Sequence, residues 1–112
     1  MTIRSFVLRQ GRITAGQERA FAEHWPRYGL DVSDALRVDA AALFGDARDL
    51  NLEIGFGNGD SLVQMAAAAP EAGYIGIEVH RPGVGHALLA AAAAGLDNLR
   101  LIRHDAVAIL RD

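Results

Sequence analysis

Short apolar runs alternate with helical segments from residue 49 onward, and this alternation constrains the fold more than any other feature. The apolar runs lie at Leu50–Ile54, Tyr74–Val79 and Leu99–Arg103. Helices are predicted from Ser61 to Ala69, where Pro70 follows, and from Pro82 to Gly95. Strands that alternate with helices at this spacing form parallel sheets with right-handed crossovers. The sequence therefore predicts an α/β fold with three parallel strands, and a further helix over residues 106–110.

Residues 1–48 lack this alternation and are expected to form an N-terminal arm with short helices. The first dozen residues show no period and are predicted to be extended. Thr14 and Gln17 match a capping box, which predicts a helix over Ala15–His24 that Pro26 and Gly29 end.

The next segment, Tyr28–Arg37, is predicted to be a loop. Asp39 can cap a short helix over Ala40–Phe44, and Gly45 can end it. We therefore divide the chain into an N-terminal part, residues 1–48, and the first half of a Rossmann-like domain, residues 49–112.

The composition narrows the class of protein. At 112 residues the chain has room for about one domain. It contains no cysteine, which excludes disulfides, thiolate metal sites and cysteine nucleophiles. No apolar run approaches the roughly 20 residues of a membrane span, and the N-terminus lacks the apolar segment of a signal peptide. A cytoplasmic protein without a membrane segment is expected.

Charge is distributed unevenly along the chain. Residues 1–28 carry five arginines and two glutamates, a net +3, whereas residues 29–112 carry six arginines and twelve acids, a net -6. Either the arginines reflect genome composition, or the arm meets a polyanion, because guanidinium groups pair well with phosphate. Under the second hypothesis Arg4, Arg9 and Arg12 are the candidate substrate-binding residues.

A glycine-rich turn follows the first predicted strand and precedes a helix, the context in which such turns approach ligands. Its glycines are Gly55, Gly57 and Gly59, so the third comes one residue earlier than in the dinucleotide pattern G-x-G-x-x-G. Glu53 and Asp60 flank the turn, and two carboxylates there would repel a diphosphate but suit a cation. This charge pattern favours S-adenosylmethionine, which carries a sulfonium and an ammonium group, over NAD.

Acidic residues also follow the second and third predicted strands. Glu78 can accept hydrogen bonds from ribose hydroxyls, and Asp105 can accept one from an adenine amino group, although Glu78 could also be a solvated strand end and Asp105 a helix cap. The carboxyl ends of parallel strands share one edge, so Glu53, Glu78 and Asp105 are predicted to converge on one crevice.

The histidines show no metal-ligand spacing, and no metal is expected; they are His24, His80, His86 and His104. Trp25 and Phe44 are predicted to pack in the interior, although Trp25 beside Arg27 could contact a base.

Three segments, residues 52–59, 76–85 and 98–106, resemble the bacterial tRNA (guanine-N7-)-methyltransferases, as does the stretch 4–12. This resemblance implies a class I methyltransferase sheet, S-adenosylmethionine as cofactor, tRNA as partner and methylation of guanine 46. It makes Glu53, Glu78 and Asp105 methyl-donor-binding positions. Family members continue into a fourth strand with an Asp-Pro-Trp-type motif, so the catalytic aspartate is expected beyond Asp112 and the chain is expected to be the cofactor-binding half.

Two alternatives remain open at the level of sequence: an NAD-type nucleotide-binding domain and a non-enzymatic RNA-binding module. The edge beside Leu50–Ile54 is also predicted to be unpaired, unless the N-terminal segment or another chain covers it. Such an edge would favour self-association.

Overall fold

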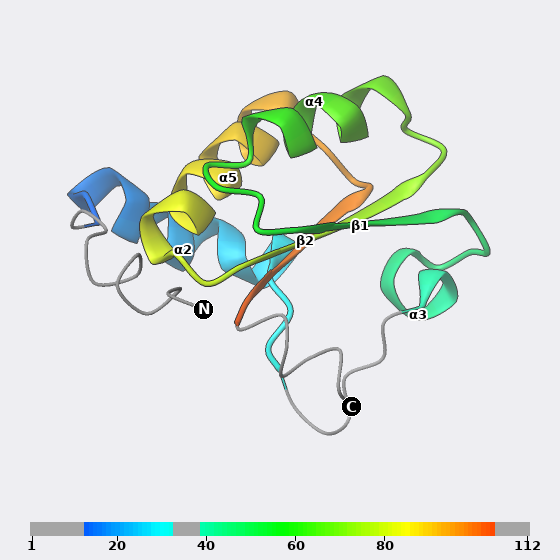
Figure 1. The fold of residues 1–112 in the computed structure, drawn as a ribbon, viewed down its shortest axis with the longest axis horizontal. Coiled ribbons are helices and arrows are strands. Elements are labelled where there is room, and N and C mark those ends of the chain that lie inside the picture. Colours follow the sequence, from blue (N-terminus) through cyan, green and yellow to red (C-terminus); the bar gives the residue numbers. More distant parts are fainter. Residues whose placement is uncertain (1–12, 33–38, 105–112) are drawn as a thin grey trace.

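The computed structural model describes residues 13–32 and 39–104, and Figure 1 shows their arrangement. Within these ranges the elements follow in the order α2 (Ala15–Tyr28), α3 (Ala40–Phe44), β1 (Leu50–Ile54), α4 (Asp60–Ala68), β2 (Gly73–Glu78), α5 (Arg81–Ala94) and β3 (Leu99–Arg103). The three strands form one parallel sheet in the order β1-β2-β3. The predicted α/β fold with three parallel strands is confirmed. The predicted helix over residues 106–110 and the extended arm lie outside the described residues.

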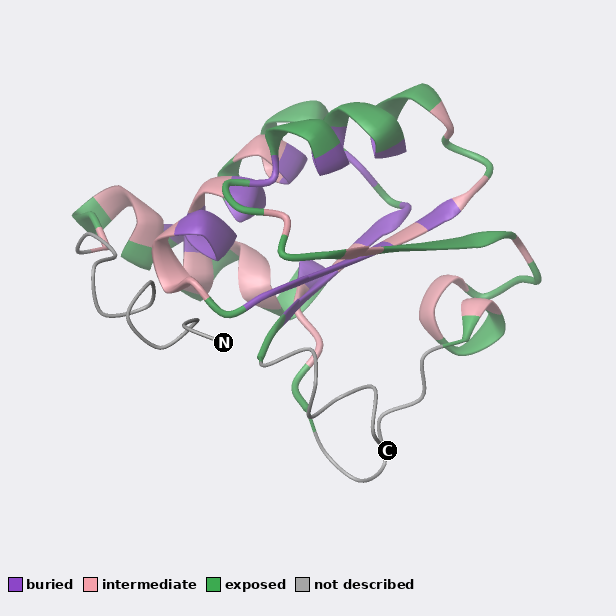
Figure 2. Cartoon of the chain, viewed as in Figure 1, coloured by how far each residue is buried: buried purple, intermediate pink, exposed green. Residues whose placement is uncertain are grey.

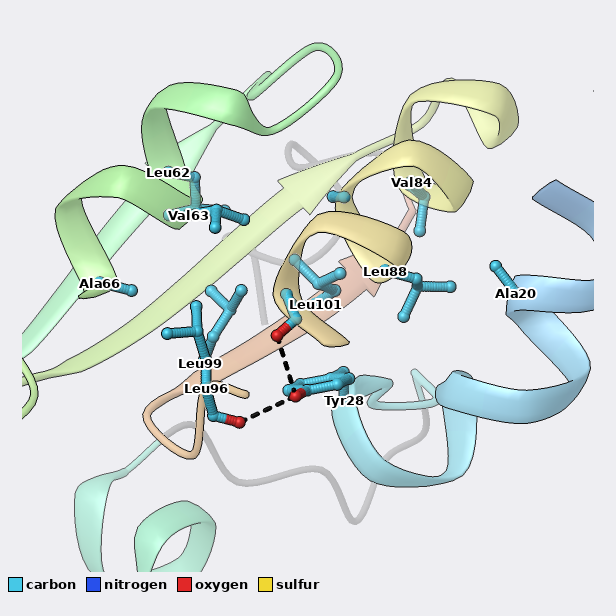
Figure 3. Close-up of a cluster of buried hydrophobic side chains, with 12 residues drawn as sticks. Ala20, Tyr28, Leu62, Val63, Ala66, Val84, Leu88, Leu96, Leu99 and Leu101 are labelled. Atoms are coloured by element: carbon cyan, nitrogen blue, oxygen red, sulfur yellow. Dashed lines mark hydrogen bonds between the residues drawn. The ribbon is translucent and has the colours of Figure 1, made fainter. Parts of the chain in front are cut away.

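Two hydrophobic layers flank the sheet. On one face α4 and α5 cover the strands, and α2 packs beside α5, as Figure 1 shows. The side chains that fill this layer include Leu62 and Val63 of α4, Val84 and Leu88 of α5, and Leu99 and Leu101 of β3 (Figure 3). A smaller cluster on the opposite face contains Ile75, Ile77 and Ile102, with Leu30 and Leu43 packed against it.

Helix α2 is longer than the sequence predicts. The capping box forms as expected: the Gln17 N–H donates to Thr14 Oγ1, and the Thr14 N–H donates to Gln17 Oε1, both at 3.0 Å. Pro26 does not end the helix, which continues to Tyr28, with Gly29 as its C-cap. The prediction of an end at His24 was therefore wrong.

Tertiary contacts explain the extra turn of α2. Tyr28 is fully buried, and its phenol lies within hydrogen-bond distance of two carbonyl oxygens (Figure 3). It donates to Ala91 in α5 (3.3 Å) and to Leu96, which follows α5 (2.9 Å). Arg27 adds a hydrogen bond and an ion pair to Asp97 at 2.6 Å. Burial raises the pKa of the Tyr28 phenol above its ordinary value, against a smaller lowering effect of Arg27. These contacts outweigh the backbone hydrogen bond that a proline inside a helix removes.

The other element boundaries lie within one residue of the predicted ones. Asp39 caps α3, since its Oδ1 accepts from the Ala42 N–H at 2.8 Å, and Gly45 ends the helix with a left-handed φ of 84°. Strand β2 begins at Gly73 and ends at Glu78, and α4 begins at Asp60.

Asn98 joins the end of α4 to the start of β3. Its side chain is 3% exposed, and its Nδ2 lies within 3.0 Å of three carbonyl oxygens, those of Ala66, Ala69 and Ala72. A single amide therefore ties together the last turn of α4 and the turn that follows it.

Strand β1 forms the outer edge of the sheet, and among the described residues it pairs only with β2. Asp49 accepts a bond from the Gly73 N–H and the Gly55 N–H donates to Ile77, so the backbone groups of residues 50, 52 and 54 point away from β2. Their side chains, Leu50, Leu52 and Ile54, are 36%, 45% and 49% exposed, and Figure 2 shows β1 as an exposed strand. The segment after α2 lies instead beside β3, where Leu30 donates to the Leu101 carbonyl.

Candidate functional site

The glycine-rich turn after β1 takes a conformation that other residues rarely adopt. Gly55, Gly57 and Gly59 have φ angles of 69°, 68° and 85°, in the left-handed region. Among the described residues, no other group lies within 4 Å of where a Cβ of Gly55 or Gly57 would stand, so on this side the backbone faces open space. Gly59 is the N-cap of α4, and a Cβ on it would lie 2.6 Å from the Cβ of Ala87 in α5. The turn therefore presents bare backbone at the carboxyl edge of the sheet.

Glu78 at the end of β2 holds this turn in place. Its side chain is mostly buried, with the residue 8% exposed. Its Oε1 accepts from the Gly57 N–H at 2.7 Å, and its Oε2 accepts from the N–H groups of Val79 and His80, both at 3.0 Å. A carboxylate offers about four lone-pair positions, so three bonds leave room for one more donor. The structure thus brings Glu78 and the glycine turn together through a direct hydrogen bond that the sequence pattern does not predict.

The first turn of α5 packs closely against the same glycine turn. A Cβ on Gly83 would lie 2.1 Å from the carbonyl oxygen of Gly57, a backbone atom that cannot rotate away. Gly83 is therefore a positioning residue that the sequence prediction missed. The Pro82-Gly83 pair was its only signal, because the need for a glycine depends on a loop 26 positions earlier in the chain.

Glu53 lies beside a hollow to which Glu78 does not contribute. It lines a hollow of about 210 Å³ on the β1 side of the sheet, together with Asn51, Leu52, Met65 and Tyr74. A Cβ on Gly76, the β2 partner of Glu53, would lie 2.4 Å from Leu62 and 2.7 Å from Phe56. Phe56 and Leu62 therefore cover the strand position between the two carboxylates.

Of the remaining predicted site residues, only Asp60 lies among the described residues. Asp60 begins α4, and its Oδ1 lies 2.9 Å from the His86 Nε2 of α5, so this carboxylate has a partner within the protein. Asp105, like the arm residues Arg4, Arg9 and Arg12, lies outside the described residues.

Neither a metal-ligand cluster nor a membrane-spanning helix occurs among the described residues. Among residues 13–32 and 39–104, no group of three or more histidine, aspartate or glutamate side chains could hold a metal ion. None of the described helices combines the length and apolar character that a membrane crossing requires.

A parallel sheet with helices in its crossovers and a bare glycine turn beside a strand-end glutamate defines part of a Rossmann-like α/β fold, a class in which many nucleotide-binding domains occur. Residues 47–112 match the family described as "Putative methyltransferase". The chain belongs to this methyltransferase family.

Curated relatives from several bacteria resemble nearly the whole chain. The protein of Halorhodospira halophila is 56% identical over 108 residues, and that of Shewanella oneidensis is 59% identical over 108 residues. The protein of Methylococcus capsulatus is 56% identical over 110 residues. Each bears the name tRNA (guanine-N(7)-)-methyltransferase. These matches cover 96%, 96% and 98% of this chain but 47%, 45% and 47% of the relatives, so the chain spans about half of their length.

Proposed function

We propose that this chain is the cofactor-binding half of a tRNA (guanine-N7-)-methyltransferase that transfers a methyl group from S-adenosylmethionine to guanine 46 of tRNA, in the cytoplasm. One observation carries the proposal: relatives of that name are 56–59% identical to the chain over 96% or more of its length. The resemblance of the glycine turn and of the segment around Glu78 points to the same family.

The described residues fit S-adenosylmethionine. Gly55 and Gly57 leave open space against their backbone, which allows a ligand to approach without a Cβ in the way. Glu78 has an acceptor position left for a ribose hydroxyl. Glu53 at the end of β1 adds negative charge on the same face of the sheet, which favours a cationic ligand over a diphosphate. In the proposed site Asp105 accepts from the adenine amino group.

Guanine N7 carries a lone pair and no proton, so its methylation needs no general base. S-adenosylmethionine, when bound, supplies a methyl group on a positively charged sulfur. The task of this chain is to hold the nucleoside by Glu78 and the glycine turn, so that catalysis comes from positioning. The negatively charged carboxylates stabilise the positive charge of the bound methyl donor during the transfer. Arg4, Arg9 and Arg12 hold tRNA phosphates. Because phosphate contacts position the RNA and carry no sequence information, selection of one guanine depends on tRNA shape.

Calorimetric titration of the chain with S-adenosylmethionine and with NAD tests the cofactor. We expect binding of S-adenosylmethionine and none of NAD. Glu78→Ala should weaken binding at least about ten-fold, the effect of one lost charge-assisted hydrogen bond, and Glu71→Ala, at an exposed turn position, should leave it unchanged.

Gly57→Ala provides a second variant in case Glu78→Ala does not fold. Its added methyl group points into the open space where the ligand is proposed to bind. Circular dichroism establishes that each variant is folded before titration. A folded chain that does not bind S-adenosylmethionine, or that binds it equally well without Glu78, would contradict the proposal.

A further inference from the structure

A second hollow, larger than the one beside Glu53, lies where α2 and the start of α5 meet the carboxyl end of β3. Its volume is about 420 Å³, within the range of sites that hold a small ligand. Polar and aromatic groups share its lining: two aromatic rings, two guanidinium groups, an imidazole and a carboxylate, from Phe21, Trp25, Arg81, Arg103, His104 and Asp31. None of these residues takes part in the cofactor site proposed above.

The aromatic rings of this hollow are held in place. The rings of Phe21 and Trp25 lie 5.8 Å apart at an angle of 35°. The indole N–H of Trp25 donates to Asp31 Oδ1 at 3.0 Å, which fixes the orientation of the indole. The guanidinium of Arg81 lies 4.7 Å from the centre of the Phe21 ring. A half-buried indole fixed in this way offers a flat surface on which a base can stack.

The charges of the hollow suit an anion. Arg103 is exposed and forms no ion pair with any of the described residues. Arg81 lies 3.8 Å from Glu18, a distance too long for a hydrogen bond. The lining carboxylate, Asp31, already accepts a bond from Trp25. Both guanidinium groups can therefore bind phosphate oxygens, for which their planar shape is well suited.

The hollow adjoins the proposed cofactor site. Arg103 is the β3 partner of Glu78, and the N–H of His104 donates to the Glu78 carbonyl at 3.1 Å. Arg81 follows His80, whose N–H donates to the Glu78 carboxylate. A ligand in the hollow would thus lie next to the nucleoside that Glu78 is proposed to hold.

We propose that this hollow binds one nucleotide of single-stranded RNA, with its base against Trp25 and its phosphate between Arg81 and Arg103. The inference rests on the proposed function, which makes RNA the substrate. Unpaired RNA nucleotides expose both a base face and a phosphate, and loops present them to aromatic and arginine side chains. S-adenosylmethionine carries no phosphate and has cationic groups that two arginines would repel, so the cofactor fits this hollow poorly.

Trp25 is the only tryptophan in the chain, and its fluorescence therefore reports on the hollow directly. The chain is titrated with a single-stranded RNA hexamer, with a 12-base-pair RNA duplex, with inorganic phosphate and with S-adenosylmethionine. We expect quenching by the hexamer, and none by the duplex, phosphate or cofactor, because only the hexamer offers an unstacked base together with a phosphate.

Two matched variants test the phosphate contact. Arg103→Gln and Arg19→Gln remove the same charge, but Arg19 is an exposed residue of α2 outside the lining. Arg103→Gln should weaken hexamer binding about ten-fold and reduce the slope of log K against log salt by about 0.7, the value for one phosphate contact on a single strand. Arg19→Gln should change the affinity less than two-fold.

The outcomes separate this inference from the proposed function. Quenching by S-adenosylmethionine instead of RNA would assign the hollow to the cofactor and overturn the inference. Calorimetric binding of the cofactor with no response of Trp25 to RNA would also overturn it, while leaving the proposed function intact. Equal losses in both arginine variants would show a diffuse charge effect and reject the nucleotide site.

Discussion

Glu78→Gln should destabilise the chain even without any ligand. The wild-type carboxylate accepts three backbone N–H bonds, from Gly57 at one oxygen and from Val79 and His80 at the other. A glutamine keeps one oxygen and replaces the other with an N–H₂ group, which cannot accept. Its best orientation turns the oxygen toward Val79 and His80 and leaves the Gly57 N–H facing another donor.

The expected loss follows from these bonds. Hydrogen bonds to a charged group contribute about 1.5–3 kcal/mol and neutral ones about 0.5–1.5 kcal/mol. The variant loses one charged bond and weakens two others, and water can reach the exposed Gly57 to replace part of the lost bond. We therefore expect the free energy of unfolding to fall by about 2–4 kcal/mol.

Urea unfolding at neutral pH, followed by Trp25 fluorescence and by circular dichroism, measures this loss. The midpoint should fall without a change in the slope of the transition, since the amount of surface buried is the same. Glu71→Gln, at an exposed position, is the control and should stay within about 0.5 kcal/mol of the wild type. A loss below about 1 kcal/mol for Glu78→Gln would refute the claim that this carboxylate holds the glycine turn.

Three further predictions concern other parts of the chain. Burial raises the pKa of the Tyr28 phenol, so the protonated phenol should stabilise the fold below the unfolded pKa of about 10. This stabilisation should be lost as pH rises through the higher folded pKa. Urea midpoints at pH 9 and pH 11 should therefore differ less in Tyr28→Phe than in the wild type. Gly83→Ala should cost about 1–3 kcal/mol, since its Cβ would meet the Gly57 carbonyl, and weaker S-adenosylmethionine binding should accompany the lower urea midpoint. We also propose that two copies of the chain associate by antiparallel pairing of their β1 edges. If this pairing is centred on Leu52, the Leu52 residues of the two copies face each other with their Cα atoms about 5.5 Å apart. Leu52→Cys should then form a disulfide-linked dimer on oxidation, whereas the exposed Leu89→Cys should not, and equal crosslinking on a non-reducing gel would reject this pairing.

The sequence predicts the local elements of this fold well, because their signals are short-range. The Thr14–Gln17 capping box, the Asp39 cap and the left-handed Gly45 need only residues within one turn of each helix end, and all three form as predicted. The end of α2 was predicted wrongly because the decisive contacts, from Tyr28 to α5, join residues more than 60 positions apart. Proline is a strong local signal, but such buried contacts override it.

The candidate site was predictable to a similar extent. The order of strand, glycine turn and strand-end acid located Gly57 and Glu78 at one edge, because parallel strands carry their carboxyl ends there. Their direct hydrogen bond and the close approach of Gly83 depend on the packing of α5, which no spacing in the sequence reveals. For the same reason the sequence could not show that Phe56 covers the strand between Glu53 and Glu78.

The contacts of Glu78 also bear on how the proposed site would work. Its three backbone bonds already fix the carboxylate and the glycine turn relative to each other, so a ligand would not have to order either of them. Binding to groups that are already in place avoids the entropy cost of ordering them. Methyl transfer that is catalysed by positioning needs such a preorganised site, because its rate depends on the alignment of the reacting atoms. A glutamate that was free in solvent could accept the same hydrogen bonds from the ribose hydroxyls, but it could not hold the nucleoside in a fixed orientation. The stability loss in Glu78→Gln and the affinity loss in Glu78→Ala therefore measure two consequences of one arrangement, and we expect them to occur together.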